Sequence, residues 1–186
     1  MFNNQFLRLL FVTVFILINS FVWLTSSESV TQKFKVGTYK GDVKDGKRDG
    51  NGVFEWKTGD HYDGHWSKGK MSGNGTMIWA NKNKYEGNFE NNLMSGHGTL
   101  TWNNGDRYDG EWKDGKINGH GIKVWKNGAK YDGDFVDEER QGQGTMTWPD
   151  GKTFSGKWIK DKASGASTSD GEFKCGHVSL FVHTFP

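Results

Sequence analysis

From Tyr39 onward, apolar and polar residues repeat one 23-residue pattern five times, without insertion or deletion. In the second unit, Tyr62, Gly64 and Trp66 alternate with polar residues, and a second alternating run follows at 73–79. An alternation of two is the period of a half-buried β-strand. A short polar turn separates the two runs. Each unit is therefore predicted to form one β-hairpin.

The same positions recur in every unit, and they are the candidate site residues of this chain. An aromatic residue opens the unit, a glycine and a bulky apolar residue follow at spacings of two, a Gly-x-Gly pair comes next, and tryptophan closes it. In the second to fifth units these residues are Tyr62, Gly64, Trp66, Gly73, Gly75, Trp79, Tyr85, Gly87, Phe89, Gly96, Gly98, Trp102, Tyr108, Gly110, Trp112, Gly119, Gly121, Trp125, Tyr131, Gly133, Phe135, Gly142, Gly144 and Trp148. Such periodicity is typical of stacked structural units, so function is expected on an extended surface rather than in a pocket.

Turn signals join one hairpin to the next. Asn104-Gly105, Asn127-Gly128 and Asp150-Gly151 are dipeptides in which both residues accept positive φ, as two-residue hairpin turns require. Strand pairing is then expected to run through the whole array. The predicted fold is all-β: an elongated, solenoid-like meander of antiparallel β-hairpins, one per 23-residue repeat, preceded by an N-terminal hydrophobic helix.

The two faces of this predicted sheet differ. The aromatic rings and the Gly-x-Gly pairs share one face, where a side chain at Gly64 or Gly75 would hold a ring off the backbone. The other face carries a polar stripe of Asn51, Asn74, His97, His120 and Gln143. Neighbours in this stripe are two strands apart, roughly 10 Å, which is too far to share a metal ion. His61 and His65 are about 13 Å apart along a strand, so no zinc pair is expected.

Composition excludes several functional classes. The 27 glycines are periodic and nine tryptophans accompany them, so disorder is not indicated. Residues 39–153 contain 17 Lys and Arg against 18 Asp and Glu, without the basic face that nucleic-acid binding requires. Cys175 is the single cysteine, so no internal disulfide forms. No nucleophile motif, phosphate loop or metal-ligand cluster occurs, so neither catalysis nor a cofactor is expected.

The N-terminal residues have the pattern of a targeting segment. Residues 9–18 are almost wholly apolar, Arg8 precedes them, and the small residues 25–27 follow. An apolar run of about 7–15 residues indicates a signal peptide, whereas a transmembrane helix needs about 17–25 residues. Residues 9–24 lie between these limits. Either a cleaved signal peptide or an uncleaved anchor places the repeats at or beyond a membrane, in a membrane-anchored or secreted protein.

These patterns together predict how the chain is organised. It comprises a signal peptide or membrane anchor at 1–27, a linker at 28–38, repeats at 39–61, 62–84, 85–107, 108–130 and 131–153, a degenerate sixth repeat or cap at 154–171, and a tail at 172–186.

The pattern Tyr-x-Gly-x-Trp, Gly-x-Gly and Trp resembles the MORN (membrane occupation and recognition nexus) repeat, most closely at 108–121. This resemblance implies a twisted β-hairpin solenoid that acts as a scaffold at membranes or cytoskeletal structures, sometimes as a dimer. Phosphoinositide binding has been suggested for the family. The chain departs from the pattern at Lys82, where the turn glycine is missing, and at Lys123, where other units have a large apolar residue. In the sixth unit, Ser167 and Gly171 replace a glycine and a tryptophan.

Two functional hypotheses remain. The first is a non-catalytic interaction scaffold that presents the aromatic and glycine face to protein partners. The second is direct binding of anionic lipid headgroups or of glycans. The cations that lipid binding would use are Lys68, Lys70, Lys113, Lys116 and Lys126; the carboxylates that offset them are Asp63, Asp109, Glu111 and Asp114.

Overall fold

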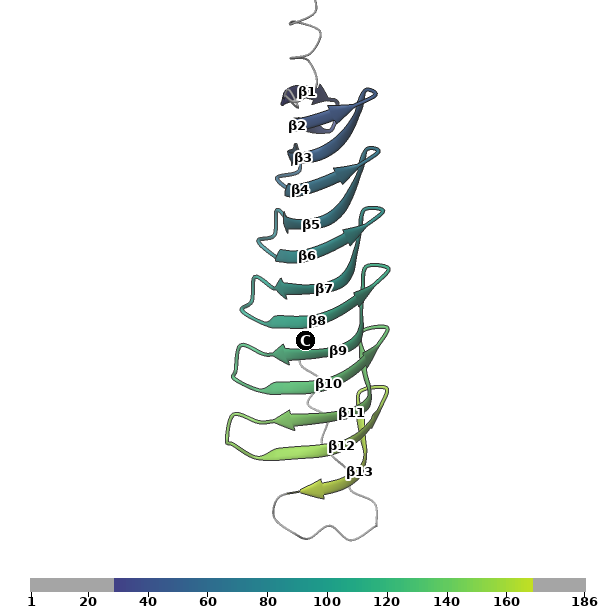
Figure 1. The fold of residues 1–186 in the computed structure, drawn as a ribbon. Helices are drawn as coiled ribbons and strands as arrows, with labels where there is room; N and C mark the ends of the chain where they lie inside the picture. The colour runs from purple at the N-terminus through teal and green to yellow at the C-terminus, as the bar shows by residue number, and fades with distance from the viewer. Residues whose placement is uncertain (1–28, 169–186) are drawn as a thin grey trace, which may run out of the picture.

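The computed structural model describes residues 29–168, which form one antiparallel sheet in which each strand pairs with its neighbours in sequence (Figure 1). The predicted all-β hairpin meander is confirmed. The expected N-terminal helix, with the rest of 1–27, and the tail at 172–186 lie outside the described residues. The strands are β1 (Val30–Phe34), β2 (Gly37–Lys44), β3 (Lys47–Trp56), β4 (His61–Ser67), β5 (Lys70–Ile78), β6 (Lys84–Glu90), β7 (Leu93–Thr101), β8 (Arg107–Lys113), β9 (Lys116–Val124), β10 (Lys130–Val136), β11 (Glu139–Thr147), β12 (Thr153–Ile159) and β13 (Lys162–Thr168).

Two kinds of turn alternate along the array, one kind on each of the two long sides where the strands end (Figure 1). Two-residue turns close the hairpin within each repeat, and both of their residues have positive φ, as at Asp114 (51°) and Gly115 (81°). This is the geometry that matches the twist of the paired strands. Lys68-Gly69, which we predicted only as part of a polar turn, has the same conformation.

The Asn-Gly and Asp-Gly turns between repeats are wider than predicted. Of Asn104 and Gly105, only the glycine has positive φ, at 97°. The amide of Gly105 donates to the carbonyl of Trp102 at 3.0 Å, and that of Trp102 to the carbonyl of Asp106 at 2.9 Å. This is a three-residue loop in which a type I turn precedes a left-handed residue. The prediction of two-residue turns at these positions was therefore wrong. In the corresponding loop of the second repeat, Lys82 takes the place of the glycine and has a φ of 72°.

Each hairpin contains a β-bulge in the same place. In β4 and β5, Gly64 pairs with Gly75, and the register then shifts so that His65 alone faces residues 72–74. Gly73 lies within this bulge at a φ of 62°, a conformation that glycine adopts without strain. The first glycine of each Gly-x-Gly pair is therefore required for its backbone conformation.

The glycine two residues after each tyrosine and the second glycine of each Gly-x-Gly pair are required because the tyrosine ring covers them. A Cβ atom at Gly98 would overlap the side chain of Tyr85, and one at Gly87 would lie 2.6 Å from the Tyr85 hydroxyl oxygen. Real Cβ atoms do not approach so closely, so the ring rests on bare backbone. The expectation that rings meet glycine is correct here, but wrong for the first glycine of each pair. A Cβ atom there would meet no aromatic ring of the column: at Gly73 its nearest neighbour would be His65, at 3.6 Å, and at Gly142 it would be the side chain of Asp134.

The N-terminal end of the array differs from the prediction. Residues 28–38, which we expected to be a linker, contain β1, and its residues Val30–Phe34 pair with β2. The ring of Phe34 stacks on Phe54 at 5.8 Å between centroids. At the other end, β12 and β13 form a sixth hairpin, in which Gly156 pairs with Ala166.

The contact between ring and glycine predicts the effect of Gly98→Val. The branched side chain would displace the Tyr85 ring, and overpacking of a buried site typically destabilises by about 1–3 kcal/mol. Gly46→Asn is the matched control, because Gly46 has a φ of 72°, which asparagine tolerates, and open space around its Cβ position. Urea unfolding should show a large loss for the first variant and almost none for the second. Equal stability of wild type and Gly98→Val would contradict the packing described here.

Candidate interaction surface

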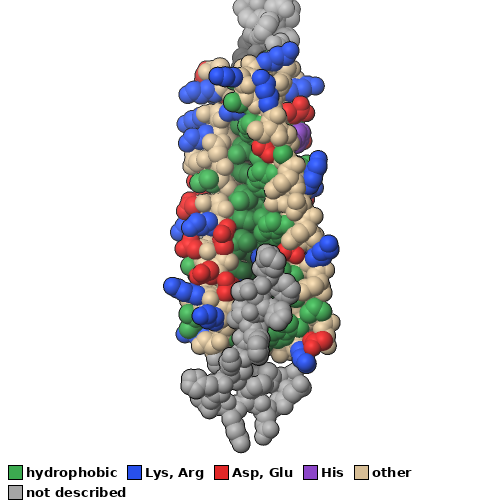
Figure 2. All heavy atoms as spheres, turned by 180° about the vertical axis from the view of Figure 1, so that it is seen from behind, with side chains coloured by type: hydrophobic (Ala, Val, Ile, Leu, Met, Phe, Trp, Pro, Cys, Tyr) green, Lys and Arg blue, Asp and Glu red, His purple; other side chains and the backbone are tan. Residues whose placement is uncertain are grey.

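The tyrosine-bearing face of the sheet, here called the inner face, carries a continuous apolar strip. Figure 2 shows it running along the array between flanks of charged and polar side chains. Its floor is the buried core, in which all five tyrosines are 0% exposed. Its partly exposed margins are formed by apolar side chains packed against that core: Val43, Trp56, Met71, Trp79, Met94, Trp102, Trp125 and Ala163. Trp148 continues the tryptophan row at 38% exposure. We call these margins and the core between them the apolar strip.

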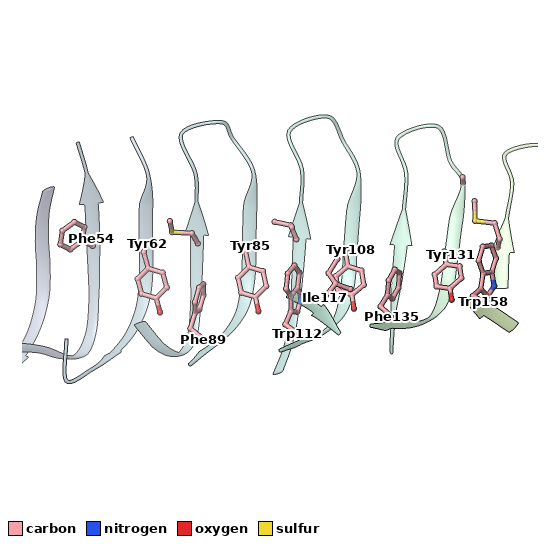
Figure 3. Packing of buried hydrophobic residues seen from close by; sticks show 14 of the residues in the cluster. Phe54, Tyr62, Tyr85, Phe89, Tyr108, Trp112, Ile117, Tyr131, Phe135 and Trp158 are labelled. Carbon is pink, nitrogen blue, oxygen red and sulfur yellow. The ribbon is translucent and has the colours of Figure 1, made fainter. Parts of the chain in front are cut away.

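The floor of the strip is a single column of aromatic rings in edge-to-face contact (Figure 3). From Tyr62 to Tyr131, each tyrosine touches the bulky ring of its own repeat and that of the next repeat, whereas Tyr39 touches only Trp66 of the next repeat. Tyr85, for example, lies 5.1 Å from Phe89 and 5.2 Å from Trp112 between centroids, at interplanar angles of 85° and 83°. The column continues without interruption from Tyr39 to Phe154. Edge-to-face pairs contribute about 0.5–1.5 kcal/mol beyond the area that they bury, so each repeat stabilises the next.

The polar atoms of the column donate hydrogen bonds to backbone carbonyls at or beside the bulge. The hydroxyl of Tyr85 donates to the carbonyl of Asn88, the bulge residue, at 3.0 Å. The indole nitrogen of Trp112 donates to the carbonyl of Gly98 at 3.0 Å. Within residues 29–168, no buried side-chain nitrogen or oxygen is left without a partner. The polar side-chain atoms of the aromatic floor are therefore all engaged within the array.

The flanks are charged but locally neutral. Lysine and carboxylate pairs lie across or along strands, such as Lys84 with Glu86 at 2.9 Å and Lys130 with Asp132 at 3.1 Å. Of the lysines considered for lipid binding, Lys116 pairs with Asp137 at 3.1 Å. Exposed pairs of this kind add little stability, but they reduce the free positive charge that an anionic surface would attract.

Three cations lie on the inner face itself. The guanidinium carbon of Arg48 is 4.1 Å from the Trp66 ring centroid, and that of Arg140 is 4.3 Å from the Trp158 centroid. The ammonium of Lys123 lies 5.1 Å and 5.4 Å from the centroids of two tryptophans of the margin. Burial lowers the pKa of Lys123 from its ordinary value, while Asp106 acts in the opposite direction.

The repeat pattern of this chain is shared with known proteins. The MORN repeat family model matches residues 39–61, 62–84, 85–107, 108–130 and 131–153. This chain belongs to the MORN repeat family. Comparison with curated proteins gives no match. Among solved structures, the chain is similar to the TCP domain of SAS-4 (dCPAP) from Drosophila melanogaster, solved in complex with a proline-rich motif of Ana2 (dSTIL). The identity is 12% and the TM-score 0.42, over 72% of this chain and 81% of that chain.

MORN repeats are generally non-catalytic modules that mediate protein or membrane-lipid interactions. Within residues 29–168 there is no helix long and apolar enough to cross a bilayer. No group of three or more potential metal ligands occurs in the same part of the chain.

The predicted signature residues fall into three structural classes. The tyrosines, the bulky residues after them and the glycines under the tyrosine rings build the floor. The first glycine of each Gly-x-Gly pair lies in the bulge, and the closing tryptophans form one margin of the apolar strip. The polar stripe from Asn51 to Gln143 is exposed on the outer face, as predicted. Its histidines face carboxylates, with His97 3.2 Å from Asp109 and His120 3.3 Å from Asp132.

Sequence reasoning missed the second margin of the strip. Aligning the chain at its 23-residue period places Arg48, Met71, Met94, Ile117 and Arg140 in one column. Apart from Met94, which follows Leu93, these positions sit between polar neighbours near the two-residue turn, so alternation alone did not single them out. A column of only large side chains at a constant register was the available signal.

Burial of the tyrosines predicts a stability loss at high pH. Burial raises the pKa of Tyr62 and Tyr131 to about 12, and raises the pKa of Tyr85 and Tyr108 further. The unfolded chain ionises near its ordinary value of about 10. Full stability is therefore expected below pH 10, with a fall between pH 10 and 12 of about 1.4 kcal/mol per pH unit for each such tyrosine.

Absorbance at 295 nm measures this directly, because all five tyrosines of the chain belong to the array. The folded protein should titrate well above the urea-unfolded protein, and urea midpoints should fall above pH 10. Superimposable titrations of the folded and unfolded protein would contradict the buried column.

Proposed function

We propose that this protein is a non-catalytic scaffold that presents its apolar strip to protein partners at or beyond a membrane. The single observation that carries the proposal is the continuity of the strip over all repeats, with its margins partly exposed. A contiguous apolar patch framed by polar residues is typical of a protein interaction site. Residues 29–168 form a single sheet, so this part of the chain supplies no second layer to cover the strip.

The chemistry of the strip favours a peptide or protein segment as the occupant. Half-exposed tryptophan and methionine side chains are enriched at protein interfaces, where charged residues are depleted. The strip offers them in a row that advances by two strands, roughly 10 Å, per repeat. A partner can therefore contact several repeats in succession and gain affinity from each.

Direct lipid binding is the weaker alternative. Headgroup recognition needs clusters of Lys and Arg without opposing carboxylates, whereas several flank lysines here pair with carboxylates, among them Lys84 with Glu86 and Lys116 with Asp137. Glycan binding would use the exposed rings of the tryptophan margin, of which Trp148 is the most exposed. Sedimentation with phosphatidylserine vesicles and retention on polysaccharide, each at low and high salt, separate these alternatives.

A matched pair of variants tests the proposal. The strip variant, Met94→Ser with Trp102→Ser, removes one apolar side chain from each margin of the strip. The outer-face variant, His97→Ser with Gln143→Ser, alters only the outer face. Wild type and the outer-face variant should capture the same proteins from the native cells. The strip variant should capture at least about tenfold less of each, since hot-spot tryptophans contribute about 2 kcal/mol or more. Mass spectrometry with isotope labels measures these ratios.

Thermal melting must show that both variants fold. If the strip variant does not, Trp148→Ser replaces it, because this ring is 38% exposed. Equal capture by the strip and outer-face variants would contradict the proposal.

Placement at a membrane rests on residues 9–24 and has its own test. The intact mass of the protein from its native cells should show either the loss of about the first 25–27 residues, which makes a secreted or lumenal protein, or the full-length chain, which favours an anchor. A mature chain that retains these residues and fractionates with soluble cytosolic proteins would contradict both forms of the prediction.

A further inference from the structure

Lys123 occupies a position that other repeats of this array fill with an apolar side chain. Phe54, Met77, Leu100 and Met146 stand at the same register and are 2–9% exposed. Lys123 pairs with Tyr108 on β8 and with Tyr131 on β10, so it lies on the inner face in the centre of the strip. A lysine in an apolar stripe gives up hydration, which is costly unless a partner restores it.

The described residues give the Lys123 ammonium no such partner. Arg48, also on the inner face, donates to the carbonyl of Gly69 at 2.7 Å, and Arg140 pairs with Asp161 at 2.9 Å. No hydrogen bond or ion pair joins the ammonium of Lys123 to any of residues 29–168. Its contacts are the rings of Trp102 and Trp125.

Asp106, the carboxylate whose charge acts most strongly on Lys123, is already engaged. Asp106 accepts a hydrogen bond from the amide of Lys126 at 2.8 Å with one oxygen. Its other oxygen accepts from the side-chain amide of Asn104 at 2.9 Å. Asp106 therefore holds together the loops of two successive repeats, and Lys123 remains a positive charge framed by apolar surface.

We propose that Lys123 selects a partner segment in which one Asp or Glu lies between apolar residues. The carboxylate pairs with the ammonium, and the apolar residues on either side cover the neighbouring tryptophans and methionines of the strip. This inference rests on the proposed function, because it names the chemistry of the partner that the strip binds. Attraction between opposite charges at a partly desolvated site contributes specificity and register more than raw affinity.

Selection of a random 12-residue peptide library on the full chain tests this inference and does not require an identified partner. The library is selected in parallel on wild type, on Lys123→Met, and on Lys126→Met. Lys126→Met is the matched control, since it removes the same charge from an exposed loop three residues away. Lys123→Met introduces the residue that stands at 77 and 146, so it should fold with an unchanged or higher melting temperature.

We expect apolar residues to be enriched in all three pools, and an acidic residue at one fixed position in the wild-type and Lys126→Met pools alone. An Asp→Asn change in a selected peptide should weaken binding to wild type about tenfold, because a hydrogen bond to a charged group at a partly desolvated site is lost. The same change should have less than a twofold effect on Lys123→Met.

The other outcomes are separable. Peptides with apolar residues but without an acidic preference, or with one that survives in Lys123→Met, would overturn the role of Lys123 and leave the proposed function intact. If no peptide is enriched on any of the three proteins, the proposed function fails as well.

Enrichment only on a chain ending at Thr168 would assign the strip to the protein's own C-terminal residues. Binding of phosphatidylserine vesicles that requires Lys123 would assign the charge to a lipid. Either result would overturn the partner-peptide proposal.

Discussion

The contact between a tyrosine ring and bare backbone is the constraint on which the whole array depends. Tyr85 covers Gly87 and Gly98 on paired strands and touches a bulky ring on each side. Because the ring needs glycine on both strands at once, the pairing register cannot shift by one residue without a steric clash. Because it also touches the next repeat, the repeats stack at a constant spacing. One side chain per repeat therefore determines register, spacing and core together.

This constraint also explains where the interaction surface lies. The column fills the centre of the inner face and leaves its polar atoms satisfied, so the remaining chemical variety is confined to the margins and flanks. The large apolar side chains at the margins are themselves only partly buried, since residues 29–168 form a single sheet and supply no second layer to pack on them. The positions that tolerate variation in this chain, such as Arg48, Lys123 and Arg140, lie on that surface. A scaffold of this kind can change its partners while keeping its fold.

Several features were predictable because they depend on short-range pattern. The alternation at Tyr62, Gly64 and Trp66 predicted strands with one packed face, and a period without insertions predicted a continuous meander. Other features depend on contacts between strands. β1 is mostly polar, and its pairing with β2 cannot be recognised from alternation within residues 30–34. The Asn-Gly loops were predicted too short, because a glycine signal does not tell whether the residue before it also turns left-handed.

The chain's periodic spacing of tyrosine, glycine and tryptophan specified the number of repeats, their hairpin form and their shared packed face, since alternation and turn chemistry act over a few residues. The bulge did not follow from it, because His65 faces three residues only once β4 and β5 are paired. Nor did the isolation of Lys123, which arises because Asp106, 17 residues earlier, is held by two loops. Side-chain partnerships across strands are decided by which atoms the sheet brings together, and only the folded array does that.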